Sequence, residues 1–313
     1  MYRHFIQMQI ELSIMSGQTD KIASKFLGQK VAGSEKYDPT LLVAIPREEN
    51  RNQYSIDKND LLFDGIDVWH CYEFSCLTEK GLPVTRLMKL RYNANSEFLV
   101  ESKSLKLYLN SFNMSRFGAN IQDCLGVCKA KIEYDLSKVI NTSVFVNFID
   151  NQSTKVTIFE DYKNILDFVS EERLLVDDFK ESPDLLFVEC FDSKSSHKIT
   201  FDSLRSNCRV THQPDFGDVY IYYNSRKHFK EDSLLKYLCS FRSEYHFHEE
   251  CVEMIYKRLY DLLDKDDELM VCALYTRRGG IDICPCRWTK NLHLCDIDEL
   301  TNIYKFARKS IKQ

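Results

Sequence analysis

A cysteine and a carboxylate seven residues apart, Cys208 and Asp215, give this chain its clearest chemical signal. A cysteine attacks an electrophile as the thiolate, so a reactive thiol needs a neighbouring group that accepts its proton. Asp215 could accept that proton and later return it to a developing anion, and His212 could do the same. Pro214 stiffens the segment that carries both groups. The pattern predicts nucleophilic catalysis by Cys208, although a cysteine is more often a small buried hydrophobe.

The composition is that of an ordinary globular protein, with 44% hydrophobic and 28% charged residues among 313. A net charge of −5 without long basic runs argues against a direct nucleic-acid partner. No run of about 18 apolar residues is present, so we expect no membrane span. Twelve cysteines behind a polar N-terminus without a secretory signal predict reduced thiols and a cytoplasmic location.

Glycine-rich nucleotide motifs are missing from a chain with only ten glycines. Neither the dinucleotide-binding fingerprint nor the P-loop motif occurs, which argues against a Rossmann or P-loop site. A nucleotide cofactor would have to bind in another way.

Hydrophobic periodicity predicts a coarse order of elements. The predicted strands are residues 84–92, 143–150, 218–224 and 269–277. The predicted helices are residues 104–112, 121–132, 233–241 and 252–263. Residues 37–52 contain two prolines and a charged run and are interpreted as loop, and the acidic residues 171–184 as a linker.

Two of the predicted helices, 104–112 and 233–241, share Ser, Leu, Tyr, Leu, Ser and Phe at equal spacing, 129 residues apart. Two unrelated amphipathic helices are the alternative, but so many identities favour a duplicated α+β module. We therefore predict an N-terminal extension (1–38), a first module (39–175) and a second module (176–313).

The two copies differ in their polar residues. The first carries Glu101, Ser102 and Lys103 before its helix, whereas only the second carries Cys208 and the pair His248-Glu249. Division of the polar groups between the copies predicts one site built from both modules.

Four segments resemble one known family, the NADPH-dependent 7-cyano-7-deazaguanine (preQ0) reductases, which are nitrile reductases of queuosine biosynthesis. The segments are residues 101–113, 206–215, 247–253 and 275–283. The resemblance extends from about residue 37 to the C-terminus and matches the long type with two modules.

The resemblance implies a fold, an activity and partners. Each module is expected to be a tunnelling fold, an antiparallel sheet with two helices on one face. The expected reaction reduces the nitrile of the small molecule preQ0 to the amine preQ1 with NADPH, a step in tRNA modification. We also expect a homodimer.

The resemblance also implies roles for residues of this chain. Cys208 would add to the nitrile carbon to give a covalent thioimide, and Asp215 would be the proton donor. His248 is a candidate proton donor for the second reduction. The expected substrate-binding residues are Val100, Glu101, Ser102, His248 and Glu249. The expected cofactor-binding residues are Ser102, Lys103, Arg278 and Gly279.

Two other functions are compatible with part of this pattern. An amidinotransferase acting on a nitrile-bearing deazaguanine would keep Cys208 and Asp215 but would not need NADPH. A purine- or pterin-binding module without catalysis would need neither residue. Oxidation of NADPH on addition of preQ0 would separate the reductase from both.

No metal site is predicted from the cysteine spacing. Cys124 and Cys128 have helical spacing, which favours packing over metal binding. Cys284 and Cys286 precede His293 and Cys295, but these spacings are too irregular for a zinc motif.

Overall fold

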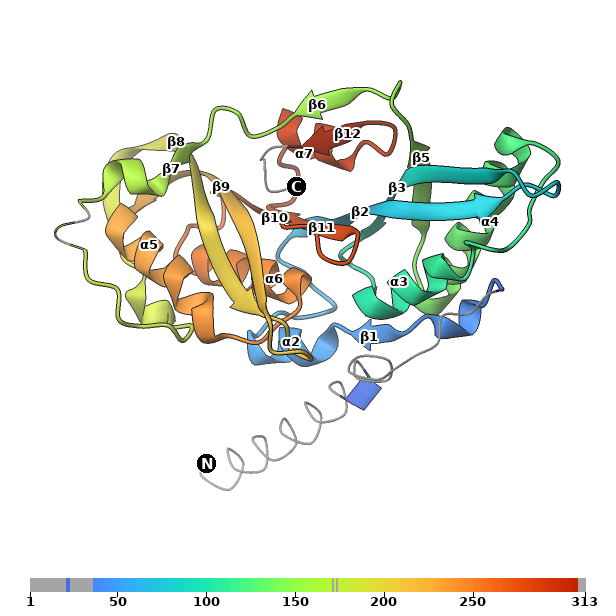
Figure 1. Cartoon of the computed structure of the whole chain (residues 1–313). Coiled ribbons are helices and arrows are strands. Elements are labelled where there is room, and N and C mark those ends of the chain that lie inside the picture. Colours follow the sequence, from blue (N-terminus) through green and yellow to red (C-terminus); the bar gives the residue numbers. More distant parts are fainter. Residues whose placement is uncertain (1–20, 23–35, 171, 173, 309–313) are drawn as a thin grey trace.

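The computed structural model describes residues 21–22, 36–170, 172 and 174–308 (Figure 1). Most of the predicted extension (1–38) therefore lies outside the described residues. Its last residues belong to the folded region, because the Tyr37 hydroxyl donates to Asp135 (2.5 Å) and the Asp38 N–H donates to Ser111 Oγ (3.0 Å). The packed part of the chain thus begins before residue 39.

One eight-stranded sheet forms the centre of the molecule, in the spatial order β5-β3-β2-β11-β10-β9-β8-β7. The strands are β2 (Asp64–Leu77), β3 (Pro83–Asn93), β5 (Val144–Ile149), β7 (Lys163–Asn164), β8 (Val188–Asn207), β9 (Pro214–Phe229), β10 (Glu268–Tyr275) and β11 (Ile281–Trp288). All neighbours pair antiparallel except β7 and β8, so the sheet is mixed. The two halves of the chain join where β2 pairs with β11.

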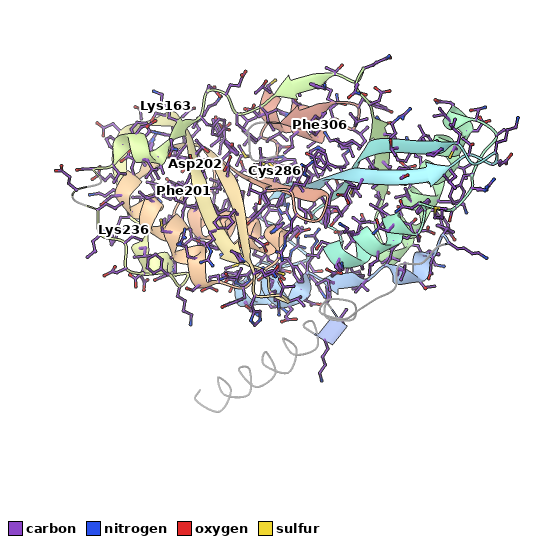
Figure 2. The ribbon with its side chains drawn as sticks, viewed as in Figure 1. Lys163, Phe201, Asp202, Lys236, Cys286 and Phe306 are labelled. Carbon is purple, nitrogen blue, oxygen red and sulfur yellow. The ribbon has the colours of Figure 1, made fainter. Side chains whose placement is uncertain are left out.

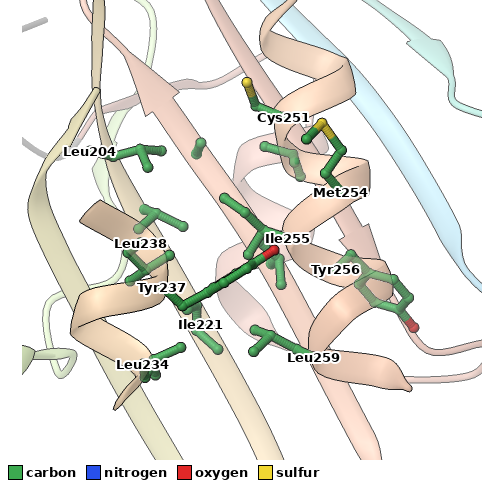
Figure 3. Close-up of a cluster of buried hydrophobic side chains, with 14 of the residues drawn as sticks. Leu204, Ile221, Leu234, Tyr237, Leu238, Cys251, Met254, Ile255, Tyr256 and Leu259 are labelled. Carbon is green, nitrogen blue, oxygen red and sulfur yellow. The ribbon is translucent and has the colours of Figure 1, made fainter. Parts of the chain in front are cut away.

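Four helices lie along one face of this sheet (Figure 1). They are α3 (Ser102–Asn110), α4 (Ile121–Val139), α5 (Glu231–Ser240) and α6 (His248–Tyr260). Alternate residues of a strand point to opposite faces, and Val219, Ile221 and Tyr223 of β9 belong to the core under α5 and α6. Figure 3 shows this core, with Leu238 of α5 and Ile255 of α6 among its residues. The predicted α+β class is confirmed.

The opposite face is covered by a C-terminal layer of α7 (Cys295–Thr301) and β12 (Phe306–Arg308). β12 pairs in parallel with β6 (Lys155–Thr157). The other set of alternating residues faces this layer, including Tyr220, Cys272 and Cys286. Figure 2 labels Cys286 on β11 and Phe306 on β12. The expected description, a sheet with helices on one face, therefore omits this layer on the opposite face.

The predicted repeat has a structural counterpart. Ser104 Oγ accepts from the backbone N–H of Val43, and Ser233 Oγ accepts from that of Phe187. The Ser111 and Ser240 hydroxyls each donate to a carbonyl three residues earlier, at 2.6 and 2.7 Å. Matching residues thus make matching bonds in α3 and α5, which two unrelated amphipathic helices would not be expected to share. The module boundaries themselves stay a prediction.

The interpretation of residues 37–52 as loop is wrong. This segment contains a 3₁₀ turn (Pro39–Leu41), β1 (Ala44–Pro46) and α2 (Glu48–Gln53). β1 pairs with β4 (Phe98–Val100). The charged residues of α2 suggested an exposed loop, but Arg51 is buried. Its guanidinium donates to both carboxylate oxygens of Glu253, at 2.8 and 2.9 Å.

Within the part of the chain that the structure describes, no helix combines the length and the apolar character needed to cross a bilayer.

Candidate active site

A cavity of about 350 Å³ lies where the two halves of the sheet meet. Its wall includes every residue to which the family resemblance gives a role: Val100, Glu101, Ser102, Lys103, Cys208, Asp215, His248, Glu249, Arg278 and Gly279. The first four come from β4 and the start of α3, and the others from the second half. The predicted composite construction of the site agrees with this arrangement.

Cys208 is placed by the hairpin of β8 and β9. β8 ends at Asn207, so Cys208 is the first residue of the loop, and its N–H donates to the Gln213 carbonyl (2.8 Å). Asp215 pairs with Ser206 across the same hairpin. The thiol is half-buried, whereas Asp215 is only 7% exposed. The hairpin thus brings a nucleophile and a carboxylate to one wall of the cavity.

Asp215 lies between two cationic or potentially cationic groups. Its Oδ1 accepts from the Arg278 guanidinium, and its Oδ2 lies 3.4 Å from His248 Nε2. Burial raises the pKa of Asp215, but His248 and Arg278 outweigh it and hold the pKa below its ordinary value. Asp215 is therefore a carboxylate at neutral pH, which is the form that accepts a thiol proton.

His248 and Glu249 are the first two residues of α6. This helix start is fixed by a hydrogen bond from the Phe247 N–H to Glu250 Oε2 (2.9 Å). The His248 ring stacks on Tyr275 with centroids 3.8 Å apart and planes 7° apart. Glu249 is buried, and among the described residues its Oε1 has no hydrogen-bond partner.

Burial raises the pKa of Glu249 to about 8, and the charge of Asp67 adds to the effect. Asp67 accepts from Arg287 (2.9 Å) and from Arg47 (2.5 Å), and all three side chains are almost fully buried. Glu253 accepts from Arg287 as well (3.0 Å). Glu249 thus borders a buried ion network, and its raised pKa favours the protonated form.

Glu101 has a structural task beside the cavity. It is the N-cap of α3, and its two carboxylate oxygens accept from the backbone N–H groups of Lys103 (2.8 Å) and Ser104 (2.6 Å). Burial raises the pKa of Glu101 in spite of these hydrogen bonds. The Ser102 hydroxyl also donates to Oε1 (3.5 Å), so Oε2 is the oxygen with a lone pair left for a further donor.

The turn between β10 and β11 supplies Arg278 and Gly279. Gly279 and Gly280 both have positive φ, which suits the turn type that closes a two-residue hairpin. A Cβ atom at Gly280 would lie 2.4 Å from the Glu73 carboxyl carbon. The Lys106 ammonium donates to the Gly279 carbonyl (2.5 Å). The turn therefore places Arg278 next to Lys106 of the first half.

The structure also separates residues that the sequence grouped. His212 is exposed on the hairpin loop, with its ring 4.8 Å from that of Tyr245, and it does not line the cavity. Cys284 is buried in β11, whereas His293 and Cys295 are exposed beyond it.

Sequence reasoning missed two residues of the cavity wall, Trp69 and His246. Trp69 lies in β2, which periodicity did not detect, and its indole N–H has no partner among the described residues. Burial lowers the pKa of His246, but Glu244 and Glu250 outweigh it and raise the pKa to about 9. The sequence signal that could have identified His246 is its position two residues before the pair His248-Glu249.

Comparison with known proteins agrees with this geometry. Residues 34–148 match the family described as "Nitrile reductase, 7-cyano-7-deazaguanine-reductase N-term", and residues 214–292 match the family described as "QueF-like protein". The first segment contains the cavity wall from β4 and α3, and the second contains Asp215, His248, Glu249, Arg278 and Gly279, whereas Cys208 lies six residues before the second segment.

The chain also resembles curated full-length proteins. It is 38% identical over 281 residues to the NADPH-dependent 7-cyano-7-deazaguanine reductase of Rickettsia felis, covering 89% of this chain and 97% of that protein. The enzyme of the same name from Colwellia psychrerythraea is 38% identical, with coverage of 83% and 90%. That from Rickettsia prowazekii is 40% identical, with coverage of 86% and 94%.

These matches and the cavity shared by the two halves of the chain define a nitrile reductase. The chain belongs to the family of the NADPH-dependent 7-cyano-7-deazaguanine reductases.

Proposed function

We propose that this protein reduces the nitrile of 7-cyano-7-deazaguanine to the aminomethyl group with NADPH. The observation that carries the proposal is the position of Cys208, Asp215 and Glu249 around a single cavity. These three residues supply a nucleophile, a proton carrier and a buried acceptor for the base.

The first step forms a bond between Cys208 Sγ and the nitrile carbon. A thiolate adds to the carbon, one π bond of the C≡N group breaks, and its electron pair goes to the nitrogen. Asp215, ionised because of His248 and Arg278, takes the proton of the thiol and returns it to that nitrogen. The product is a neutral thioimide, a C=N group that accepts a hydride more readily than a nitrile does.

From the thioimide, formation of the amine takes two hydrides and one proton, and one further proton restores the Cys208 thiol. NADPH supplies the hydrides when it is bound. After the first, the C–S bond breaks and Cys208 leaves as the thiolate. The remaining imine nitrogen needs a proton during the second reduction, and His248, held on Tyr275 beside Asp215, is the proposed donor.

Recognition of the base follows from Glu249. A deazaguanine presents N–H donors on its pyrimidine edge, and a carboxylate accepts two of them in parallel. Glu249 is buried and borders the cavity with an oxygen that makes no hydrogen bond among the described residues. We propose that Val100 and Ser102 complete the contacts with the base, together with the remaining lone pair of the Glu101 carboxylate.

The residues around the mouth of the cavity fit a phosphorylated cofactor. Lys103, Lys106 and Arg278 line it together, and they offer ammonium and guanidinium donors for phosphate. Among the described residues Lys103 makes no ion pair, so its charge is available for an anion. We propose that Ser102, Lys103, Arg278 and Gly279 hold NADPH.

The finer architecture is part of the same proposal. We propose that residues 39–175 and 176–313 are two tunnelling-fold modules whose sheets merge through β2 and β11. The matching serine contacts in α3 and α5 support the duplication. A homodimer remains our expectation for the assembly, testable by sedimentation.

The function is tested by NADPH absorbance on addition of 7-cyano-7-deazaguanine. We expect two equivalents of NADPH to be oxidised per nitrile, and none by the Cys208→Ala variant. Cys190→Ala removes an exposed cysteine of β8 and is the matched control. Conversion of the nitrile without NADPH consumption would contradict the proposal and favour an amidinotransferase.

A further inference from the structure

Three buried thiols meet between β2 and α4, outside the cavity. Cys76 lies near the end of β2, and Cys124 and Cys128 lie one turn apart in α4. All three residues have no exposed surface, and their sulfur atoms lie within 4.8 Å of one another. The closest pair, Cys76 and Cys124, is separated by 3.3 Å. Sequence spacing alone gave Cys124 and Cys128 a packing role, because it could not reveal Cys76 beside them.

Sulfur contacts within this trithiol cluster distinguish it from a lone buried cysteine. Cys76 Sγ and Cys124 Sγ lie 3.3 Å apart, and Cys124 Sγ also lies 3.5 Å from the Leu77 carbonyl oxygen. Arg86 on the adjacent strand β3 adds positive charge near Cys76.

A second group with ligand-type side chains, His70, Asp282 and Cys284, does not share this character. Its carboxylate already accepts from the Tyr72 hydroxyl (2.6 Å) and bonds His70 Nδ1 (2.7 Å). That carboxylate is satisfied by protein donors, whereas the sulfur atoms of the trithiol cluster mainly contact one another. The trithiol cluster is therefore the stronger candidate for a ligand.

Its dimensions suit a metal ion bound by thiolates. Zinc–sulfur bonds of about 2.3 Å place two sulfur ligands of one tetrahedral ion roughly 3.8 Å apart. The observed sulfur spacing brackets that value, so small side-chain movements would suffice. Soft thiolate ligands select Zn²⁺ and Cu⁺ over harder cations.

We propose that Cys76, Cys124 and Cys128 bind one thiophilic d¹⁰ metal ion, Zn²⁺ or Cu⁺. Three sulfurs complete the coordination of Cu⁺. Zn²⁺ takes a fourth ligand, for which the Leu77 carbonyl oxygen, 3.5 Å from Cys124 Sγ, is a candidate. Binding requires the cysteines as thiolates and therefore releases their protons.

The site joins parts of the chain that are 48 residues apart. A metal bound there would hold the first turns of α4 against β2 and so stabilise the first half of the sheet. None of its three cysteines lines the cavity, so the site is structural and separate from the reduction of the nitrile.

The test uses the full chain with Cys208→Ala, which removes the half-buried reactive thiol, under reducing conditions. The protein is stripped with a chelator, given one equivalent of Zn²⁺ or Cu⁺ in separate arms, and desalted before metal analysis. We expect about one ion per chain in at least one arm, and the arm that retains it identifies the metal. The Cys124→Ser/Cys128→Ser variant should lose at least tenfold of this retention. Cys71→Ser, a buried cysteine of the same strand, should keep it.

A thermal melt of the chain with Cys76, Cys124 and Cys128 intact gives a second test that does not depend on whether the variants fold. The metal that is retained should raise the midpoint of the chain with its three cysteines intact, and a chelator should reverse the rise. Less than a tenth of an equivalent in both arms would overturn the proposal. Retention that survives loss of Cys124 and Cys128 in a folded variant would overturn it as well, as would a Cys76–Cys124 disulfide in the freshly isolated, metal-free chain.

Discussion

His248 Nε2 lies 3.4 Å from Asp215 Oδ2, although His248 is the first residue of α6 and Asp215 is the second residue of β9. The His248 ring is held by stacking on Tyr275, at the end of β10. The opposite carboxylate oxygen accepts from Arg278. Two proton-carrying groups are thus fixed next to each other on the cavity wall that carries Cys208, so each can serve a different protonation.

Asp215→Asn removes the group that we propose carries the proton from thiol to nitrogen. We expect turnover to fall by roughly 10²–10⁴, the range for loss of an acid–base group. Steady-state NADPH oxidation measures this, with His212→Ala as the control because His212 is exposed and outside the cavity. A near-normal rate for Asp215→Asn together with a slow His212→Ala variant would contradict this assignment and give the proton transfer to His212.

Glu249 makes the free energy of unfolding depend on pH. Its folded pKa of about 8 lies above its ordinary value, so the folded state holds a proton that the unfolded state has lost. Stability from this group is complete below about pH 4.5 and is lost as the pH rises through about 8. Relative to Glu249→Gln, the wild-type protein should lose on the order of 5 kcal/mol across this window. Urea unfolding at several pH values measures the difference, and parallel profiles would disprove it.

The raised pKa of Glu249 also predicts that substrate binding releases a proton. The raised pKa favours the protonated form at neutral pH, but Glu249 accepts two N–H donors only as the carboxylate. Calorimetry of 7-cyano-7-deazaguanine binding to a Cys208→Ala chain, in buffers of different ionisation enthalpy, counts that proton. We expect close to one proton at pH 7 and few at pH 9. A count that does not change with pH would place the acceptor elsewhere.

Lys103→Ala should raise the Michaelis constant for NADPH without preventing thioimide formation. Its ammonium is proposed to meet a phosphate, and the adduct forms before any hydride is needed. Kinetics with NADPH and NADH, compared with the exposed Lys265→Ala variant, measure the effect. We expect the preference for NADPH over NADH to shrink. If adduct formation fails instead, Lys103 belongs to the substrate site.

From the sequence, Glu101→Leu is expected to weaken substrate binding with fold stability unchanged, and the structure does not support the second part. Glu101 caps α3 with both oxygens, and loss of an N-cap costs about 0.5–2 kcal/mol. Glu101→Gln keeps one acceptor for the helix and is the better variant for calorimetry. If it binds the base as tightly as its parent, then Glu101 is only a cap.

The sequence was informative where local pattern and chemistry agree. Helices α3 and α5 were found because their serines and tyrosines recur at equal spacing, and the cavity residues because they stand in short motifs. The strand β2, with Trp69, was missed because burial on both faces removes the alternation of a half-buried strand.

Other features depend on contacts between distant segments. The charged residues of α2 look solvated in sequence, but Arg51 is neutralised by Glu253, 202 positions later. The pKa of Glu249 likewise depends on Asp67 in the other half of the chain. Pairing of β2 with β11 creates both relationships, and no local pattern reveals it.

Mass spectrometry of the protein mixed with 7-cyano-7-deazaguanine, without NADPH, tests the role of Cys208 most directly. We expect a gain of one substrate mass, located on the peptide that contains Cys208, and no gain for Cys208→Ala although that variant still binds the base. Absence of an adduct on the wild-type chain, or an adduct of full mass on Cys208→Ala, would contradict it.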